Sequence, residues 1–186
     1  MAAVAKGVVR VDVVSDTVCP WCFIGKRRLE TAIRKFQGQK SFEKFGEQRV
    51  KQMIPMMMET FAKEGLNYSM EGQTGSTLNS HRLIALAGQQ GLDKQDKVVE
   101  ALFRAYFTEG QFINDKQVLL KAAEQASISG AEELLNDEDE LKSEVLHEVK
   151  TLAKGVTGVP FFIIDGKHSL SGAQESETFV KMFEKL

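Results

Sequence analysis

The sequence predicts an α/β fold in which two short β segments, one near each end of the chain, enclose a long helical middle. Val8–Val14 is an apolar, β-branched run that is typical of a buried strand, and Val159–Ile164 is a second such run. The residues between them show helical rather than alternating spacing. We therefore predict one domain made of residues 1–40 and 155–186, with residues 41–154 inserted as an all-helical subdomain.

Composition excludes several classes of function. The 186 residues carry a formal net charge of -2 with a pI near 6.0, so we expect no binding to nucleic acid or to anionic membranes. Residues 1–7 lack the pattern of a secretory signal, and no apolar run is long enough to span a bilayer. We therefore expect a cytoplasmic protein, in which a cysteine pair is more often catalytic or metal-binding than structural.

The first strand leads into a reactive corner. It is followed by polar turn residues and then by Cys19-Pro20-Trp21-Cys22, which holds both cysteines of the chain. Apolar residues then recur with helical spacing as far as Phe36, and a proline suits the first turn of a helix. The order predicted here is strand, corner, helix.

A second strand is missing where one is expected. A βαβ unit needs a parallel strand after its helix, but residues 37–41 form a polar turn and helical spacing resumes at Phe42. We therefore predict a sheet of about three strands without its second, edge strand. The first strand would then be an exposed apolar edge, so we expect either reduced stability or a homodimer that forms through this edge.

The middle of the chain predicts a series of helices. The first is expected from Val50 to Phe61, with a kink at Pro55. Two of the methionines Met56–Met58 fall on its apolar stripe, so core packing is favoured over a pliable binding surface. Further helices are expected over residues 77–90, 93–108, 115–126 and 137–154. The acidic run at residues 136–140 is interpreted as a solvated helix start.

The chain ends with a hairpin and a helix. The run Val159–Ile164 is followed by an Asp-Gly-Lys turn and a short strand, His168–Ser171. A last helix is expected over Glu175–Leu186.

The two cysteines can carry redox chemistry. A helix N-terminus favours negative charge, so the pKa of Cys19 there should be lowered, which makes Cys19 the candidate nucleophile. Cys22 lies one helical turn deeper, where it can resolve a mixed disulfide. Two other interpretations are weaker: a metal site lacks further ligands at suitable spacing, and two inert buried cysteines explain the Pro-Trp spacer poorly.

Two other polar residues could assist the cysteines. His81 could face them and bind substrate, although a lone helical histidine is more often structural. Asp12 either points to solvent or accepts a proton near the pair, since burying it unpaired would be costly.

The two ends of the chain resemble the DsbA-like branch of the thioredoxin superfamily, and more narrowly FrnE-type proteins. The match rests on residues 13–26 around Cys-Pro-Trp-Cys, on Gly155–Phe162 and on Leu170–Gln174, while residues 76–90 resemble the helical insert of the family. The resemblance implies a thioredoxin-like fold in which Pro160 follows a cis peptide bond and lies against Cys19. Val159 and Pro160 would hold a peptide or glutathione beside the nucleophile.

The predicted function is therefore thiol–disulfide oxidoreduction of protein, peptide or small thiol substrates by Cys19 and Cys22. Pro20, Trp21, Val159, Pro160 and His81 are the expected substrate-binding residues. No metal or resident cofactor is expected, but glutathione could be a co-substrate. Two alternatives stay open: a glutathione-dependent transferase or isomerase of the kappa-class type, and a non-catalytic binding or chaperone module.

Overall fold

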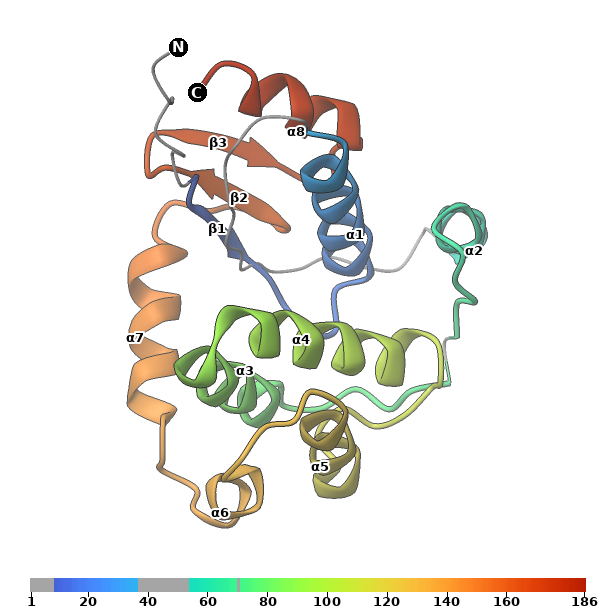
Figure 1. Ribbon diagram of the computed structural model, residues 1–186. Helices are drawn as coiled ribbons and strands as arrows, with labels where there is room; N and C mark the ends of the chain where they lie inside the picture. Colours follow the sequence, from blue (N-terminus) through green and yellow to red (C-terminus); the bar gives the residue numbers. More distant parts are fainter. Residues whose placement is uncertain (1–8, 37–53, 70) are drawn as a thin grey trace. The chain divides into compact units, whose positions relative to one another are not determined.

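The computed structural model describes residues 9–36, 54–69 and 71–186 (Figure 1). The chain divides into two compact units, residues 1–49 with 157–186 and residues 50–156. The first unit therefore takes its elements from both ends of the chain. The domain boundaries expected from the sequence stay a prediction.

The first unit combines a small sheet with two helices. Its sheet has the order β1-β2-β3, and both neighbouring pairs are antiparallel. The elements of this unit are β1 (Val11–Val14), α1 (Pro20–Lys35), β2 (Phe161–Ile164), β3 (His168–Ser171) and α8 (Ser176–Phe183). The predicted α/β architecture is confirmed, and so is the three-stranded sheet of the described residues.

The hairpin between β2 and β3 forms at the predicted Asp-Gly turn. Asp165 and Gly166 both have positive φ, 50° and 65°, and the N–H of Lys167 donates to the carbonyl of Ile164 at 3.1 Å. Two successive positive φ values suit a two-residue hairpin, because they match the twist of the strands. The turn therefore sets the register in which Phe162 lies opposite Leu170.

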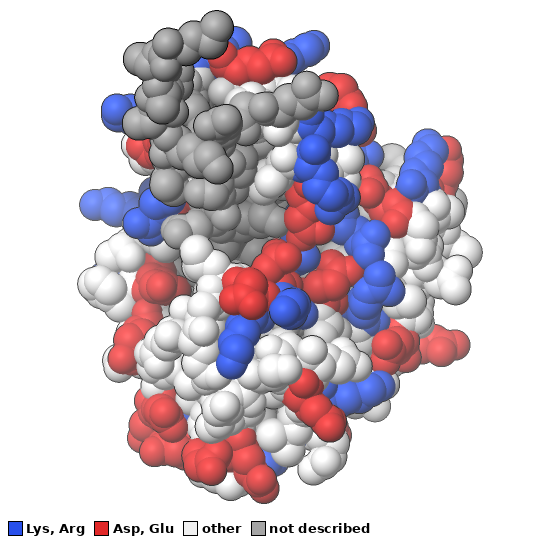
Figure 2. Space-filling model, viewed as in Figure 1, with Lys and Arg blue, Asp and Glu red and all other residues white. Residues whose placement is uncertain are grey.

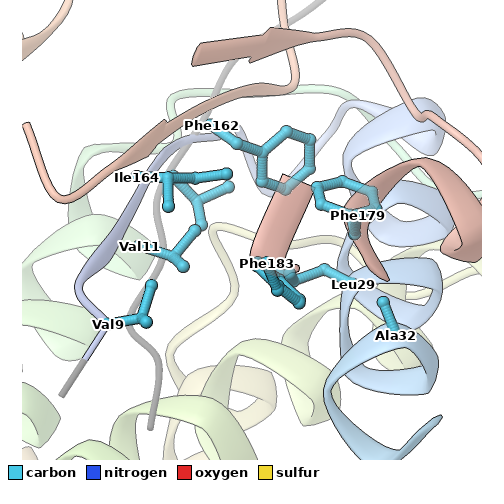
Figure 3. Packing of buried hydrophobic residues seen from close by; sticks show 9 residues of the cluster. Val9, Val11, Leu29, Ala32, Phe162, Ile164, Phe179 and Phe183 are labelled. Atoms are coloured by element: carbon cyan, nitrogen blue, oxygen red, sulfur yellow. The ribbon is translucent and has the colours of Figure 1, made fainter. Parts of the chain in front are cut away.

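A hydrophobic cluster fills the space between the sheet and the two helices (Figure 3). Alternate residues of β2 are buried, which places Phe162 and Ile164 in the cluster, and the Phe162 ring meets Phe179 edge to face with centroids 4.8 Å apart. The other buried members are Val9, Val11, Val13, Leu29, Ala32 and Phe183. Each large side chain buried here stabilises the unit by about 1.5–3 kcal/mol.

The expectation that the first strand is exposed is wrong. β1 ends the described sheet, but all of its residues are buried, and none is more than 8% exposed. Val11 and Val13 pack in the hydrophobic cluster, while the guanidinium Nε of Arg10 donates to both carboxylate oxygens of Asp12 at 2.8 and 3.0 Å. Asp12 is therefore neither solvated nor unpaired, and β1 offers no exposed apolar edge to a second copy. The segment of the predicted strand deletion lies outside the described residues.

The second unit is helical in its described part. It contains α2 (Ile54–Lys63), α3 (Leu78–Gln90), α4 (Leu92–Phe107), α5 (Lys116–Gln125), α6 (Ala131–Asn136) and α7 (Lys142–Leu152). The helices predicted over 77–90, 93–108 and 115–126 are confirmed to within two residues. Within the described part of the chain, no helix is long and apolar enough to cross a membrane.

The described part of α2 corrects one expectation, that for the methionines Met56–Met58. The described part of α2 begins at Ile54, and the predicted residues 50–53 lie outside the described range, so the kink expected at Pro55 stays a prediction. Met57 is 1% exposed, but Met56 and Met58 are 49% and 55% exposed. Only one methionine of the run therefore packs in the interior.

A buried arginine organises the connection between α6 and α7. Arg82 of α3 is 2% exposed, and its guanidinium donates to the backbone carbonyls of Leu134, Asp137 and Glu140, with the first and last at 2.8 and 2.6 Å. It also donates to the Asn79 side chain at 3.0 Å. The guanidinium thus satisfies carbonyl groups that the end of α6 leaves unpaired.

The acidic run is a connection rather than a helix start, which corrects the expected helix over 137–154. The Asp137 carboxylate accepts from the backbone N–H groups of Asp139 and Glu140 at 2.8 and 3.2 Å, and α7 begins only at Lys142. Residues 137–140 are all exposed. Figure 2 shows acidic side chains gathered at the lower end of the view, where α6 lies.

Candidate redox site

Cys19 lies at the N-terminus of α1. It is the N-cap residue, and its carbonyl accepts from the N–H groups of Cys22 and Phe23 at 3.0 and 3.3 Å, while Pro20 occupies the first helical position. The first turn of α1 contains no acidic residue. The helix N-terminus therefore presents its partial positive charge at Cys19, an arrangement that favours a thiolate.

Cys22 is one turn further along α1 and is 2% exposed, while Cys19 is 0% exposed. Neither cysteine forms a disulfide. Burial raises the pKa of Cys22 well above its ordinary value, and the hydrogen bond and charge of Cys19 act in the same direction. The two cysteines therefore differ in environment. Cys19 lies at the N-terminus of α1, whereas burial favours the neutral thiol form of Cys22.

Val159 and Pro160 complete the site from the far end of the chain. The peptide bond between them is cis, as the family resemblance implies. The Cys19 Sγ lies 3.9 Å from the carbonyl oxygen of Val159, and the carbonyl of Pro160 accepts from the N–H of Gly172 at 2.8 Å. The hairpin thus anchors the loop that carries Val159 beside the first cysteine.

Gly25 lets α1 approach this loop closely. A Cβ at Gly25 would lie 2.9 Å from the Pro160 Cγ and 3.1 Å from the Phe162 Cζ. Real Cβ atoms do not tolerate such a distance, so only glycine fits here without a shift of the proline. Sequence analysis missed this residue, although an isolated glycine inside a helical pattern often has a packing role.

The corner before α1 holds two further residues that sequence analysis missed. The Asp16 carboxylate accepts from the N–H of Val18 at 3.0 Å, and its backbone carbonyl accepts from the N–H of Cys19 at 3.1 Å. Ser15 acts against burial and lowers the pKa of Cys22. An aspartate that bonds a backbone N–H two residues ahead is a common turn former, which is the signal that could have identified it.

The two remaining residues of the predicted site are Trp21 and His81. Trp21 is half-buried in the first turn of α1, next to Pro20. His81 is half-buried in α3 of the second unit, and its backbone N–H donates to the Thr77 carbonyl at 3.0 Å. The first unit therefore brings together Cys19, Cys22 and the Val159–Pro160 loop, while the role of His81 stays a prediction.

No group of three or more His, Cys, Asp or Glu side chains that could hold a metal ion is found among the residues that the structure describes.

The family model of the DSBA-like thioredoxin domain matches residues 10–184. The chain belongs to the DSBA-like thioredoxin domain family. The expected DsbA-like branch is thus confirmed, and the FrnE-type assignment within it stays a prediction.

Individual relatives of this family cover nearly the whole chain. The structure described as a probable DsbA oxidoreductase, SCO1869 of Streptomyces coelicolor, is 28% identical, covers 95% of this chain and 89% of that chain, and has a TM-score of 0.79. The cytosolic disulfide reductase DsbM of Pseudomonas aeruginosa is 18% identical, with 95% and 97% covered and a TM-score of 0.71. The latter likeness shows the fold alone. YwbO of Bacillus subtilis, an uncharacterised protein, is 24% identical over 212 residues that cover 93% of this chain and 94% of YwbO.

Proposed function

We propose that this protein is a thiol–disulfide oxidoreductase in which Cys19 is the nucleophile and Cys22 the resolving thiol. One arrangement carries the proposal. Cys19 is the N-cap residue of α1, its Sγ lies 3.9 Å from the Val159 carbonyl oxygen, and the buried thiol of Cys22 lies one helical turn away. Membership of the DSBA-like family supports the same chemistry.

The reaction runs in two exchanges. The Cys19 thiolate attacks a substrate disulfide, so that a bond forms between Cys19 and one substrate sulfur while the other sulfur leaves as a thiolate and takes a proton from solvent. The Cys22 thiolate then attacks the Cys19 Sγ, and the first substrate sulfur leaves. The substrate gains two electrons, and the protein keeps a Cys19–Cys22 disulfide. A small or protein dithiol must reduce this disulfide again, and the reverse sequence would oxidise a substrate.

The Val159–Pro160 loop is proposed to position the substrate. An extended peptide or the backbone of glutathione beside Val159 would lie next to the Cys19 Sγ. A structure of DsbM, a fold relative, was solved with glutathione, which supports glutathione as a small thiol co-substrate here. DsbM is also named as cytosolic, in keeping with our expectation of a cytoplasmic protein.

Single cysteine variants test this proposal, because the chain has two cysteines. In an insulin reduction assay, Cys19→Ser should fall to the background rate. Cys22→Ser should accumulate a mixed disulfide with insulin or glutathione, visible by mass under non-reducing conditions. Equal trapping by both variants, or full turnover by Cys19→Ser, would refute the assignment of roles. Client binding that survives replacement of both cysteines would favour a non-catalytic module instead.

A further inference from the structure

The turn at residues 172–175, between β3 and α8, contacts both α1 and the loop that carries Pro160. It is compact, because Gly172 has a positive φ of 78° and the backbone N–H of Gln174 donates to the Gly172 carbonyl at 2.9 Å. On one side of the turn, the backbone N–H of Gly172 donates to the Pro160 carbonyl at 2.8 Å. The position of the 172–175 turn therefore affects the position of the Pro160 loop.

Arg28 of α1 binds the same turn from the other side. Its side chain is 14% exposed, and Nη1 donates to the Ala173 carbonyl at 2.8 Å. The same nitrogen lies 2.8 Å from the carboxylate of Glu175, whose side chain is 68% exposed. Ala173 belongs to neither a helix nor a strand, so the guanidinium pairs a carbonyl that regular secondary structure leaves unpaired. A hydrogen bond from a charged donor is stronger than one between neutral groups.

Arg28 and Gly25 lie one helical turn apart on the same face of α1. A Cβ at Gly25 would lie 2.9 Å from the Pro160 Cγ and 3.5 Å from the Ala173 Cα. This face of α1 therefore contacts the loop and the turn together, Gly25 by close packing and Arg28 by a hydrogen bond. Because Cys19 begins the same helix, α1 sets the position of the nucleophile and of the loop opposite it.

Arg28 can act on the reaction only through this loop. It lies nine residues beyond Cys19, about 13 Å along the helix axis, which is too far for contact with the reacting sulfur atoms. The Val159 carbonyl oxygen, however, lies 3.9 Å from the Cys19 Sγ. A shift of the loop therefore changes the space beside the nucleophile, where an extended substrate would lie.

We propose that Arg28 is a positioning residue for disulfide exchange: by holding the Ala173 carbonyl on α1, it fixes the Val159–Pro160 loop beside Cys19. The inference rests on the proposed function in taking this loop as the element that binds substrate. Arg28 is then needed for a disulfide in a peptide, which binds along the loop. It is not needed for a small disulfide that reaches Cys19 without a peptide backbone.

The first test measures the contact without any activity. Amide hydrogen exchange in ¹⁵N-labelled protein follows the Gly172 N–H, which is bonded to the Pro160 carbonyl. Arg28→Met removes the donor to Ala173 and should speed this exchange by about fivefold, because the 172–175 turn opens more often. The amides of β1 and β2 are the internal reference and should exchange at the rates of the parent.

The second test compares two disulfides in single-turnover reactions of the reduced protein, quenched with acid and followed by the number of remaining thiols. With insulin, the second-order rate constant of Arg28→Met should fall about tenfold, because the loop no longer aligns the peptide with Cys19. With 2-hydroxyethyl disulfide, the rate constant should stay within about twofold of the parent. A variant that has merely lost structure would change both rate constants by the same factor.

Two further variants serve as matched controls. Lys35→Met removes another cation that joins α1 to the C-terminal segment, but Lys35 contacts Ser176 and Glu177 of α8 rather than the 172–175 turn. Glu175→Gln removes the charge that Arg28 pairs with and keeps its hydrogen bond to Ala173. Both variants should match the parent in hydrogen exchange and in both rate constants.

The two tests separate failure of this inference from failure of the proposed function. Unchanged Gly172 exchange in Arg28→Met overturns the inference, even if the protein reduces insulin, and so does equal slowing with both disulfides. Losses in Glu175→Gln as large as those in Arg28→Met would assign the effect to the ion pair and also overturn it. If the parent reduces neither disulfide, the proposed function fails, while hydrogen exchange still tests the contact.

A second substitution keeps the inference testable if Arg28→Met does not fold. Arg28→Gln keeps a polar side chain but is too short to reach the Ala173 carbonyl. Faster Gly172 exchange with a selective loss of insulin reduction in this variant supports the inference, and values equal to those of the parent refute it.

Discussion

Two connections in this molecule each contain a buried charged side chain that is satisfied by backbone groups. At the corner before α1, Asp16 accepts a backbone N–H; between α6 and α7, Arg82 donates to three backbone carbonyls. Each side chain fixes a stretch of irregular chain that secondary structure leaves unpaired. The two regions thus use the same physical device with opposite charge.

Asp16 and Arg82 differ in the groups that surround them. Asp16 lies in the turn that leads into the cysteine pair, and its backbone carbonyl accepts from the backbone N–H of Cys19 at 3.1 Å. The guanidinium of Arg82 is engaged by neutral carbonyls and by the Asn79 side chain, so its charge stabilises the connection. A buried ionisable side chain therefore holds the backbone in both regions, but only the corner also carries the two cysteines.

The largest expected effect is on the Arg82 side of this comparison. Arg82→Met keeps the length of the side chain but leaves three backbone carbonyls without their donor, and the buried one, that of Leu134, costs about 1–3 kcal/mol when it is unpaired. We expect a loss of about 3 kcal/mol or more in the free energy of unfolding, measured by urea denaturation. Arg104→Met is the control, because Arg104 is exposed and pairs with Glu100 on the surface of α4, and it should change stability by less than about 0.5 kcal/mol. Equal losses in the two variants would show that the carbonyl contacts of Arg82 add little.

A substitution at Gly25 should cost less stability than Arg82→Met but more catalytic activity. Gly25→Ala forces the Pro160 ring away from α1, which should cost about 1–3 kcal/mol of stability. Because the same loop carries Val159 against the Cys19 Sγ, insulin reduction should fall by about 10- to 100-fold.

Gly158→Ala supplies the control for Gly25→Ala. A Cβ at Gly158 meets no atom within 4 Å, so this variant should keep its activity and stay within about 1 kcal/mol of the parent stability. If Gly25→Ala proved as active as Gly158→Ala, close packing of α1 on Pro160 would not be needed for the reaction.

The smallest expected effect is the acid response of the α6–α7 connection. Hydrogen bonds from the backbone N–H groups of Asp139 and Glu140 hold the pKa of Asp137 below its ordinary value of 3.8, and Arg82 acts in the same direction. The pKa of Asp137 is lower in the folded protein than in the unfolded chain. The ionised carboxylate therefore stabilises the folded protein above the unfolded pKa, and this stabilisation is lost as the pH falls through the folded pKa. D137N keeps an acceptor that does not titrate, so its stability should fall less than that of the parent between about pH 4 and pH 2. Parallel acid unfolding curves would contradict this.

Strong local patterns made much of the fold predictable. The amphipathic spacing of α1 and the Asp-Gly turn of the hairpin can each be recognised from residues that are close together in the sequence. α6 is six residues long, too short for a periodic pattern to emerge. The acidic run at 137–140 suits a helix start and a connection equally well, and the choice between them is made by Arg82, whose contacts lie 52 to 58 positions away in the chain.

The site was predictable to the extent that it is a local motif. Cys19 and Cys22 follow from their spacing, whereas Pro160 was reached through the family resemblance. Gly25 could not be interpreted alone, because its role depends on the Pro160 ring that packs against it. Likewise, periodicity placed Met58 on the apolar stripe but could not tell which side of that stripe faces the interior.

The joining of the two chain ends in the first unit has a consequence for synthesis. The backbone N–H of Arg10 donates to the Asp165 side chain, and the backbone N–H of Asp165 donates to the carbonyl of Arg10, although the two residues are 155 positions apart. At about 5–20 residues per second, the ribosome needs roughly 7 to 30 s after making β1 before its partner strand exists. During that time the valines of β1 and both thiols belong to a nascent chain without a sheet, so the redox corner matures only after β2 has been synthesised.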